Sequence, residues 1–152
     1  MPTHSDYDLK TAVQRTANAY ARIANRTMGC KIQIPVPLDF DLCYINPKWA
    51  GSASHTMSIS INMVLLQDYP IEIINDTVPH EIAHLVQFDK FDHEGAQTAG
   101  HGWEWQEIMR RLGKKPVKCH TLDVTRALKV HKEHVAKMRK KGKKRKSTDD
   151  EE

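Results

Sequence analysis

This sequence has few cysteines, no long apolar run and no leader-like N-terminus. Its three cysteines, Cys30, Cys43 and Cys119, follow no spacing that indicates a disulfide framework. No apolar stretch approaches the roughly 18 residues that a membrane span needs, and the first residues lack the charged and apolar regions of a signal peptide. We therefore expect an intracellular protein with no membrane partner. It would be cytoplasmic or nucleoid-associated, or nuclear if the source is a nucleated cell. We also expect a monomer.

The excess of positive charge is confined to one end of the chain. Residues 1–128 hold 13 basic and 14 acidic residues, a net charge of −1, whereas residues 129–152 hold 10 and 5, a net charge of +5. Such a basic run is usually disordered and can neutralise phosphates without reading base sequence. We predict a folded domain at 1–128 and a disordered basic tail with an acidic end at 129–152. Its non-specific contacts to DNA would come from Lys137, Arg139, Lys140, Lys141, Lys143, Lys144, Arg145 and Lys146.

The most informative motif is H-E-x-x-H at residues 80–84. On a helix, His80 and His84 share one face, about 5–6 Å apart at Cβ, so both imidazoles can bind one metal ion. Zinc suits this ligand type and geometry. Glu81 can then face a zinc-bound water and act as the general base of metal-assisted hydrolysis, most naturally of a peptide bond.

A catalytic zinc ion needs a third protein ligand and an open fourth position. The metzincin pattern is excluded, because Gln87 and Lys90 stand where it requires glycine and histidine. His101, between two glycines that allow a close approach of the backbone, is our preferred third ligand. The alternatives are His93, Glu94 and Glu104, of which Glu104 is the serious rival because a glutamate from a following helix is a known solution.

Two segments of the sequence resemble the SprT-like zinc metallopeptidase family. They are V-P-H-E-I-A-H-L at 78–85 and H-G-W-E-W at 101–105, followed by Leu112-Gly113, and the likeness covers roughly residues 36–123. The resemblance implies that His80, His84 and His101 bind one catalytic zinc ion and that Glu81 is the catalytic base. It also implies that residues 61–66 form a short strand leading into the helical region. Many members carry a C-terminal zinc ribbon, but this sequence has no C-x-x-C pair.

The resemblance further implies protein substrates that are associated with DNA or crosslinked to it, as expected for a repair protease. A basic tail would raise the concentration of such a protease on nucleic acid. His120 and Tyr44 are candidates for stabilising the oxyanion of the transition state. Two alternatives stay open: a catalytically silent regulator that binds zinc and nucleic acid, and a metal-dependent amidohydrolase acting on a non-peptide substrate.

Hydrophobic periodicity predicts the elements around these residues. We expect helices at 6–26, 70–88 and 101–112, with Pro79 either kinking or restarting the second. Alternation predicts strands at 38–45 and 56–61, paired antiparallel, with a loop at 46–53. The polar stretch 89–100 reads as a mobile loop beside the site. The predicted fold is a small α+β, zincin-like metallopeptidase domain with a short antiparallel sheet and an HExxH active-site helix.

Overall fold

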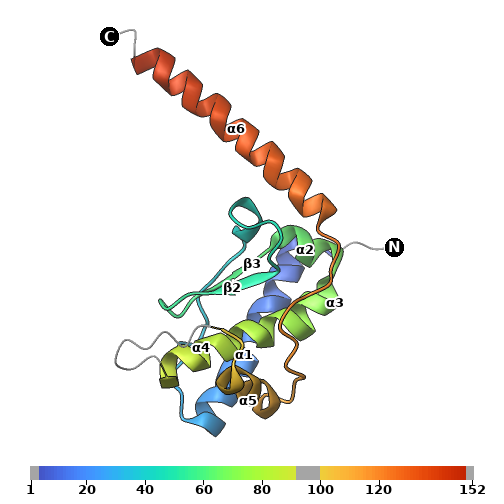
Figure 1. The fold of residues 1–152 in the computed structure, drawn as a ribbon, viewed down its shortest axis with the longest axis vertical. Helices are drawn as coiled ribbons and strands as arrows, with labels where there is room; N and C mark the ends of the chain where they lie inside the picture. The colour runs from blue at the N-terminus through green and yellow to red at the C-terminus, as the bar shows by residue number, and fades with distance from the viewer. Residues whose placement is uncertain (1–3, 92–99, 150–152) are drawn as a thin grey trace.

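The computed structural model describes residues 4–91 and 100–149, with side chains described as far as residue 143. A small sheet lies beside a group of helices, and a long C-terminal helix projects away from the rest of the molecule (Figure 1). The α+β prediction is confirmed. Within the described ranges, no helix is long and apolar enough to cross a membrane.

The first helix, α1 (Asp6–Met28), begins and ends with recognisable capping residues. Ser5 accepts a hydrogen bond from the Asp8 backbone N–H at 3.1 Å, and Gly29 ends the helix in the left-handed conformation, with φ 66°. Its buried side chains recur every three to four residues and half of them are alanine, so that α1 lies close against α4 (Val78–Phe91). The predicted helix at 6–26 is therefore confirmed.

The sheet is mixed and not purely antiparallel as predicted. Strand β3 (Ile59–Ile61) lies in the centre, parallel to β1 (Leu38–Asp39) and antiparallel to β2 (Gly51–Ala53). The predicted strand at 38–45 is cut short, because the Asp39 carboxylate accepts from the Asp41 backbone N–H and a 3₁₀ turn, η1 (Leu42–Tyr44), follows. β2 lies where a loop was predicted. It forms the edge of the sheet that runs along α4.

Of the residues 61–66 that were predicted as a strand, only Ile61 lies in one, as the last residue of β3, because Asn62 starts helix α2 (Met63–Asp68). The Asn62 side chain accepts from the backbone N–H groups of Val64 and Leu65 at 3.1 and 3.2 Å, which is an N-cap. Its amide also donates to two carbonyl oxygens of the loop before β2, at 3.0 Å each. The same buried side chain thus begins a helix and anchors the loop that leads to the edge strand.

Pro79 neither breaks nor restarts the helix that carries the motif. Helix α3 (Pro70–Glu72) passes into a π-helical turn, η2 (Ile73–Thr77), and then directly into α4. In the wider turn the Val78 N–H bonds to the Ile73 carbonyl. Pro79 has no N–H to donate, and the π turn directly before it accommodates that loss.

Helix α5 (Trp103–Arg111) starts two residues later than predicted, so His101 lies just before it. Gly113, with φ 79°, ends the helix in a Schellman arrangement: its N–H bonds to the Arg110 carbonyl and the next N–H bonds to the Met109 carbonyl, each at 2.9 Å. α5 packs on α4 through the buried face that Trp105, Ile108 and Met109 form.

Helix α6 (Thr125–Asp149) runs through residues 129–149, most of the stretch for which we predicted a disordered tail. The segment contains no proline and is rich in Lys and Arg, which are good helix formers. Its first turn is held by the domain, since Ala127 is fully buried and Arg126 bonds to Asp68 at 3.0 Å. The division of the chain at residue 128 stays a prediction.

Candidate metal centre

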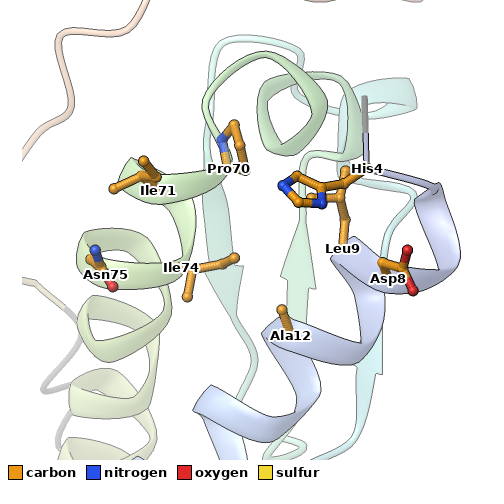
Figure 2. Close-up of a pocket in the computed structure, with 8 residues that line it drawn as sticks. All are labelled: His4, Asp8, Leu9, Ala12, Pro70, Ile71, Ile74 and Asn75. Carbon is orange, nitrogen blue, oxygen red and sulfur yellow. The ribbon is translucent and has the colours of Figure 1, made fainter. Parts of the chain in front are cut away.

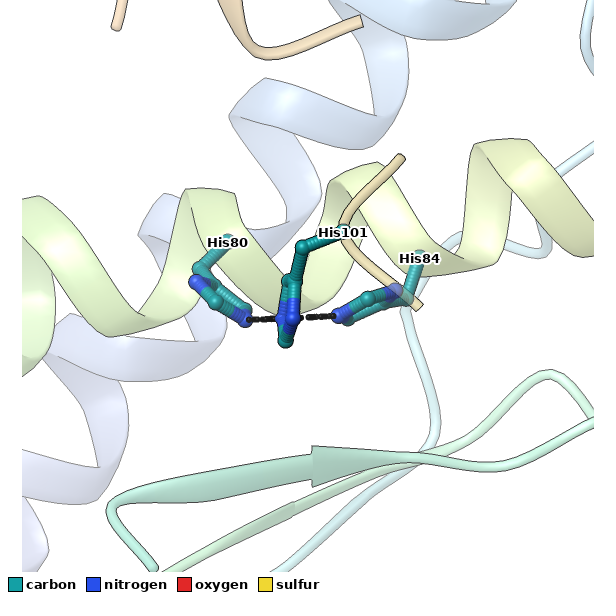
Figure 3. A group of neighbouring side chains, drawn as sticks. All are labelled: His80, His84 and His101. Carbon is teal, nitrogen blue, oxygen red and sulfur yellow. Dashed lines mark hydrogen bonds between the residues drawn. The ribbon is translucent and has the colours of Figure 1, made fainter. Parts of the chain in front are cut away.

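Three histidine side chains converge on one point beside α4 (Figure 3). His80 and His84 come from successive turns of α4, and His101 reaches across from the segment before α5. Their Nε2 atoms form a triangle with edges of 3.3 Å (His80–His84), 3.2 Å (His84–His101) and 3.0 Å (His80–His101). Ligands about 2.0–2.1 Å from a tetrahedral ion lie roughly 3.3 Å apart. The residues therefore fit a metal ion at the point that the sequence predicts.

Burial keeps these imidazoles in the form that binds metal. Desolvation lowers the pKa of His80 to about 3, with help from the two neighbouring histidines. Desolvation also lowers the pKa of His84, to about 4, and that of His101. Neutral imidazoles offer a lone pair to a cation, whereas protonated ones repel it. At neutral pH the cluster is thus ready to take up metal without first losing protons.

Trp105 forms a packed surface against all three imidazoles. Its side chain is fully buried, and its ring centroid lies 4.7 Å from those of His80 and His101 and 5.8 Å from that of His84. Its indole N–H donates to the His80 backbone carbonyl at 3.3 Å. Periodicity alone marks Trp105 as a core residue, which is correct, but gives no sign that it supports the metal site. Trp103, by contrast, is 70% exposed.

Two glutamines connect to the histidines from outside the triangle. Gln87 places Oε1 2.8 Å from Nδ1 of His84, and the Gln106 amide donates to the His101 backbone carbonyl at 3.0 Å. Gln87 thus contacts the imidazole of His84 itself, whereas Gln106 contacts the backbone that carries the imidazole of His101. Neither glutamine was predicted as a site residue, because a glutamine in a helix carries no recognisable motif.

Glu81 is almost completely buried, only 5% exposed, next to the histidine triangle. Its Oε1 lies 3.9 Å from Nε2 of His80, and desolvation raises the pKa of its carboxyl to about 8. Strand β2 covers it: a Cβ added to Gly51 would meet Thr77 Cγ2 at 2.8 Å and Glu81 Cγ at 2.9 Å. Gly51 was predicted only as part of a loop. A glycine within a strand often marks a point where another group approaches the backbone closely. That is the sequence signal by which the contact of Gly51 with Glu81 could have been found.

The two predicted oxyanion stabilisers are bound elsewhere. Tyr44 is 44% exposed and packs against His134 of α6, with ring centroids 4.2 Å apart. His120 donates from Nε2 to the Lys48 carbonyl at 2.7 Å and accepts at Nδ1 from the Leu122 N–H at 3.1 Å. No hydrogen bond or ring contact among the described residues joins either side chain to the triangle. Their role stays a prediction.

The remaining predicted residues lie apart from the cluster or outside the described residues. The metal-ligand group found in the described ranges consists of the three histidines alone, without Glu104. His93 and Glu94, with most of the predicted loop at 89–100, lie outside the described residues, although Asp89–Phe91 still belongs to α4. On α6, five predicted basic residues are exposed: Lys137, Arg139, Lys140, Lys141 and Lys143. The side chains of Lys144, Arg145 and Lys146 lie outside the described residues.

A cavity of about 310 Å³ lies elsewhere, between the start of α1 and the α3–η2 segment (Figure 2). Its lining is mainly apolar and consists of His4, Asp8, Leu9, Ala12, Pro70, Ile71, Ile74 and Asn75. It includes none of the residues of the histidine cluster. The chemistry of the three histidines and the buried glutamate, and not the size of a cavity, therefore identifies the candidate site.

The sequence of this chain is similar to the sequences of several known proteins. The model of the SprT-like family matches residues 11–134. A protein named SprT from Yersinia pseudotuberculosis serotype IB (strain PB1/+) is 32% identical over 118 residues, which are 76% of this chain and 65% of that protein. Another protein named SprT, from Pseudomonas savastanoi pv. phaseolicola (strain 1448A / Race 6), is 37% identical over 128 residues, 83% of this chain and 69% of that protein.

A shorter match, 40% identical over 73 residues, joins 47% of this chain to 43% of a protein named SprT from Pseudomonas syringae pv. tomato (strain ATCC BAA-871 / DC3000). The chain thus spans 65% of the length of the Yersinia relative. No solved structure matches. All three histidines and Glu81 lie within the residues that the family model covers.

Proposed function

The chain belongs to the SprT-like family, and from that premise we propose that it is a zinc-dependent metallopeptidase that cleaves DNA-associated or DNA-crosslinked proteins. The observation that carries the proposal is the triangle of three Nε2 atoms, 3.0–3.3 Å apart, with a buried carboxylate 3.9 Å from one of them. Three imidazole ligands with a carboxylate that is not itself a ligand suit metal-assisted hydrolysis.

His80, His84 and His101 would hold the zinc ion through Nε2. When bound, zinc supplies a Lewis acid that makes water more acidic and polarises the substrate carbonyl. The charge of a bound cation would lower the pKa of Glu81 from its metal-free value of about 8. Its carboxylate then takes a proton from the water that attacks the peptide carbon, and gives that proton to the amine that leaves. Its near-complete burial under Gly51 keeps the carboxylate beside the triangle and away from bulk water.

The edge strand β2 offers a binding surface for an extended polypeptide. It pairs with β3 on one side only, and no strand of the described residues lies along its other edge. Backbone groups of an edge strand can pair with a peptide of any sequence. Because Gly51 of this strand touches Glu81, a peptide added along the edge would run close to the carboxylate.

The basic face of α6 supports the second half of the proposal, contact with DNA. Lys137, Arg139, Lys140, Lys141 and Lys143 are all exposed on a helix whose base is fixed to the domain. Each Lys or Arg that neutralises a phosphate strengthens binding without sequence preference and makes it salt-dependent. Substrate proteins on DNA would thus meet the protease at a raised local concentration.

The decisive experiment compares wild type with Glu81→Gln, each loaded with zinc, for cleavage of a DNA-binding protein with and without single-stranded DNA. We expect Glu81→Gln to keep its zinc and to lose cleavage by a factor of about 10² or more. Zinc bound by both proteins without fragments from either would favour a non-proteolytic regulator. Turnover of small amides, but not of proteins, would favour an amidohydrolase.

The DNA contact needs its own variants. Replacing the five exposed basic residues of α6 with glutamine should weaken DNA binding and lower its dependence on salt by about one unit of slope per lost phosphate contact. A control variant replaces three exposed basic residues of α1, Arg15, Arg22 and Arg26, with glutamine and should leave both quantities nearly unchanged. Equal effects from the two variants would argue against α6 as the DNA-binding element.

A further inference from the structure

Gln87 is one of very few polar side chains that the described part of the fold buries. It is 1% exposed, and the other buried polar residues in the described ranges are Asn62, Thr77 and Glu81. Asn62 caps a helix and anchors a loop, while Thr77 and Glu81 lie under Gly51. Glutamine is seldom buried unless its amide has a partner. Gln87 lies one helical turn after His84 on α4 and directs Oε1 to Nδ1 of that imidazole at 2.8 Å.

This contact determines which nitrogen of His84 carries the proton. A neutral imidazole has one N–H and one lone pair. With Nδ1 donating to Gln87 Oε1, the lone pair lies on Nε2, the atom that faces Nε2 of His80 and His101 at 3.3 and 3.2 Å. If the amide NH₂ of Gln87 donated instead, Nδ1 would be the acceptor. The proton would then lie on Nε2, inside the triangle, and would exclude a cation from it.

Packing fixes the plane of the His84 ring but not its protonation. The imidazole is nearly parallel to Trp105, with ring centroids 5.8 Å apart and planes at 24°, and to Phe88, at 6.4 Å and 20°. Apolar ring faces hold an imidazole in place without distinguishing its two nitrogens. Among the described neighbours of His84, Gln87 is the residue with a polar atom on Nδ1.

We propose that Gln87 is a positioning residue of the metal centre, which keeps His84 protonated at Nδ1 and presents the lone pair of Nε2 to the ion. The inference rests on the proposed function in one respect, that the triangle binds zinc. Partners on the outer nitrogen of a metal-binding histidine orient the ring and raise its basicity. The amide oxygen of Gln87 is suited to both effects.

The test measures zinc affinity by competition with a chelator, and the cobalt(II) absorption spectrum as a report of coordination geometry. Gln87→Met keeps the length of the side chain but removes the acceptor, and Gln87→Asn keeps the amide but cannot reach Nδ1. We expect both to weaken zinc binding by about 10–100-fold and to alter the cobalt spectrum. Gln87→Glu retains an acceptor and should bind zinc within about threefold of wild type or more tightly.

The control is Gln14→Met, which removes a part-buried, hydrogen-bonded glutamine on α1 that contacts Asn18 and the Val36 carbonyl. It should leave zinc affinity unchanged. Wild-type affinity in folded Gln87→Met and Gln87→Asn would overturn the inference, as would an equal loss in Gln87→Glu. A wild type that binds no zinc would remove the premise of both proposals. A wild type that binds zinc without cleaving proteins would overturn the proposed function and leave the role of Gln87 standing.

Discussion

Gly51 of strand β2 lies directly against Glu81 of α4, with no room for a side chain between them. A Cβ at position 51 would come within 2.9 Å of Glu81 Cγ and 3.2 Å of its Oε1, and within 2.8 Å of Thr77 Cγ2. We expect Gly51→Ala to displace the carboxylate and to lower peptide cleavage by about 10–100-fold. Zinc affinity should change little, since the histidines lie outside this contact. Cleavage rate and zinc content of the same preparation provide the measurement.

Gly142→Ala is a suitable control for that substitution. Position 142 lies on α6, and a Cβ there would meet nothing within 4 Å. Alanine in a helix is favoured over glycine by about 1 kcal/mol, so this variant should be active and at least as stable as wild type. Full activity of Gly51→Ala would mean that the edge strand can move away from Glu81 without cost.

The buried carboxyl of Glu81 should make the metal-free protein sensitive to pH. Burial raises its pKa from 4.5 to about 8, so the neutral form stabilises the fold, and this stability is lost as pH rises from about 4.5 through about 8. Glu81→Gln removes this dependence. The free energy of unfolding of the variant should exceed that of wild type above pH 8, by roughly 2–5 kcal/mol, and approach it near pH 4.

Denaturant unfolding of both metal-free proteins at several pH values measures this difference. His80 and His84, with pKa values lowered to about 3 and about 4, add a loss of stability as pH falls below 6.5. That loss is common to both proteins and cancels in the comparison. A difference between the two proteins that does not change with pH would show that Glu81 titrates as an exposed glutamate does.

The helix that carries the motif could be predicted, because two histidines that bind one ion from a helix need a fixed spacing. His80 and His84 must lie one turn apart, and the capping signals of Ser5 and Gly29 fix the bounds of α1. The prediction that His101 completes the set also agrees with the geometry, although it lies before α5 and not within it. Local rules of spacing and capping therefore predicted the helices, whereas His101 was preferred for its flanking glycines and for the family resemblance.

Strand pairing and the surroundings of the site could not be predicted, because they depend on contacts between distant residues. Each strand has only two or three residues, too few for alternation to show direction or register. The role of Gly51 depends on a helix that lies about 30 residues later in the chain. Gln87 lies close to the motif, yet only the rotamer of His84 reveals its contact.

Trp105 should contribute to both stability and metal binding. It is fully buried, packs against three imidazoles and donates to the His80 carbonyl at 3.3 Å. Trp105→Phe keeps an aromatic ring but removes the N–H and part of the packed surface, which should cost about 1–3 kcal/mol and weaken zinc binding. Trp103→Phe, at a position 70% exposed, should change stability by no more than about 0.5 kcal/mol. Similar losses of stability in Trp105→Phe and Trp103→Phe would contradict the role given to Trp105.

Arg126 should fix the base of α6 without affecting the metal centre. Its Nε donates to both carboxylate oxygens of Asp68 at 3.0 Å, and its Nη2 donates to the Val64 carbonyl at 3.2 Å and to the side-chain oxygen of Gln67 at 2.7 Å. The pair is partly exposed, so its ionic attraction is weak and the set of hydrogen bonds carries most of the effect. Arg126→Gln should therefore speed amide hydrogen exchange in the first turns of α6 by about 3–10-fold and leave α4 unchanged.

Lys129→Gln changes an exposed basic residue one turn later on the same helix and controls for the loss of charge. It should leave the exchange of α6 as in wild type. Unchanged exchange in Arg126→Gln would mean that the buried Ala127 and the hydrogen bond from His131 Nδ1 to the Cys43 carbonyl, at 3.0 Å, hold the helix by themselves. A simultaneous loss of zinc affinity would instead mean that α6 and the histidine triangle are coupled through η1 and α2, the elements that α6 packs on.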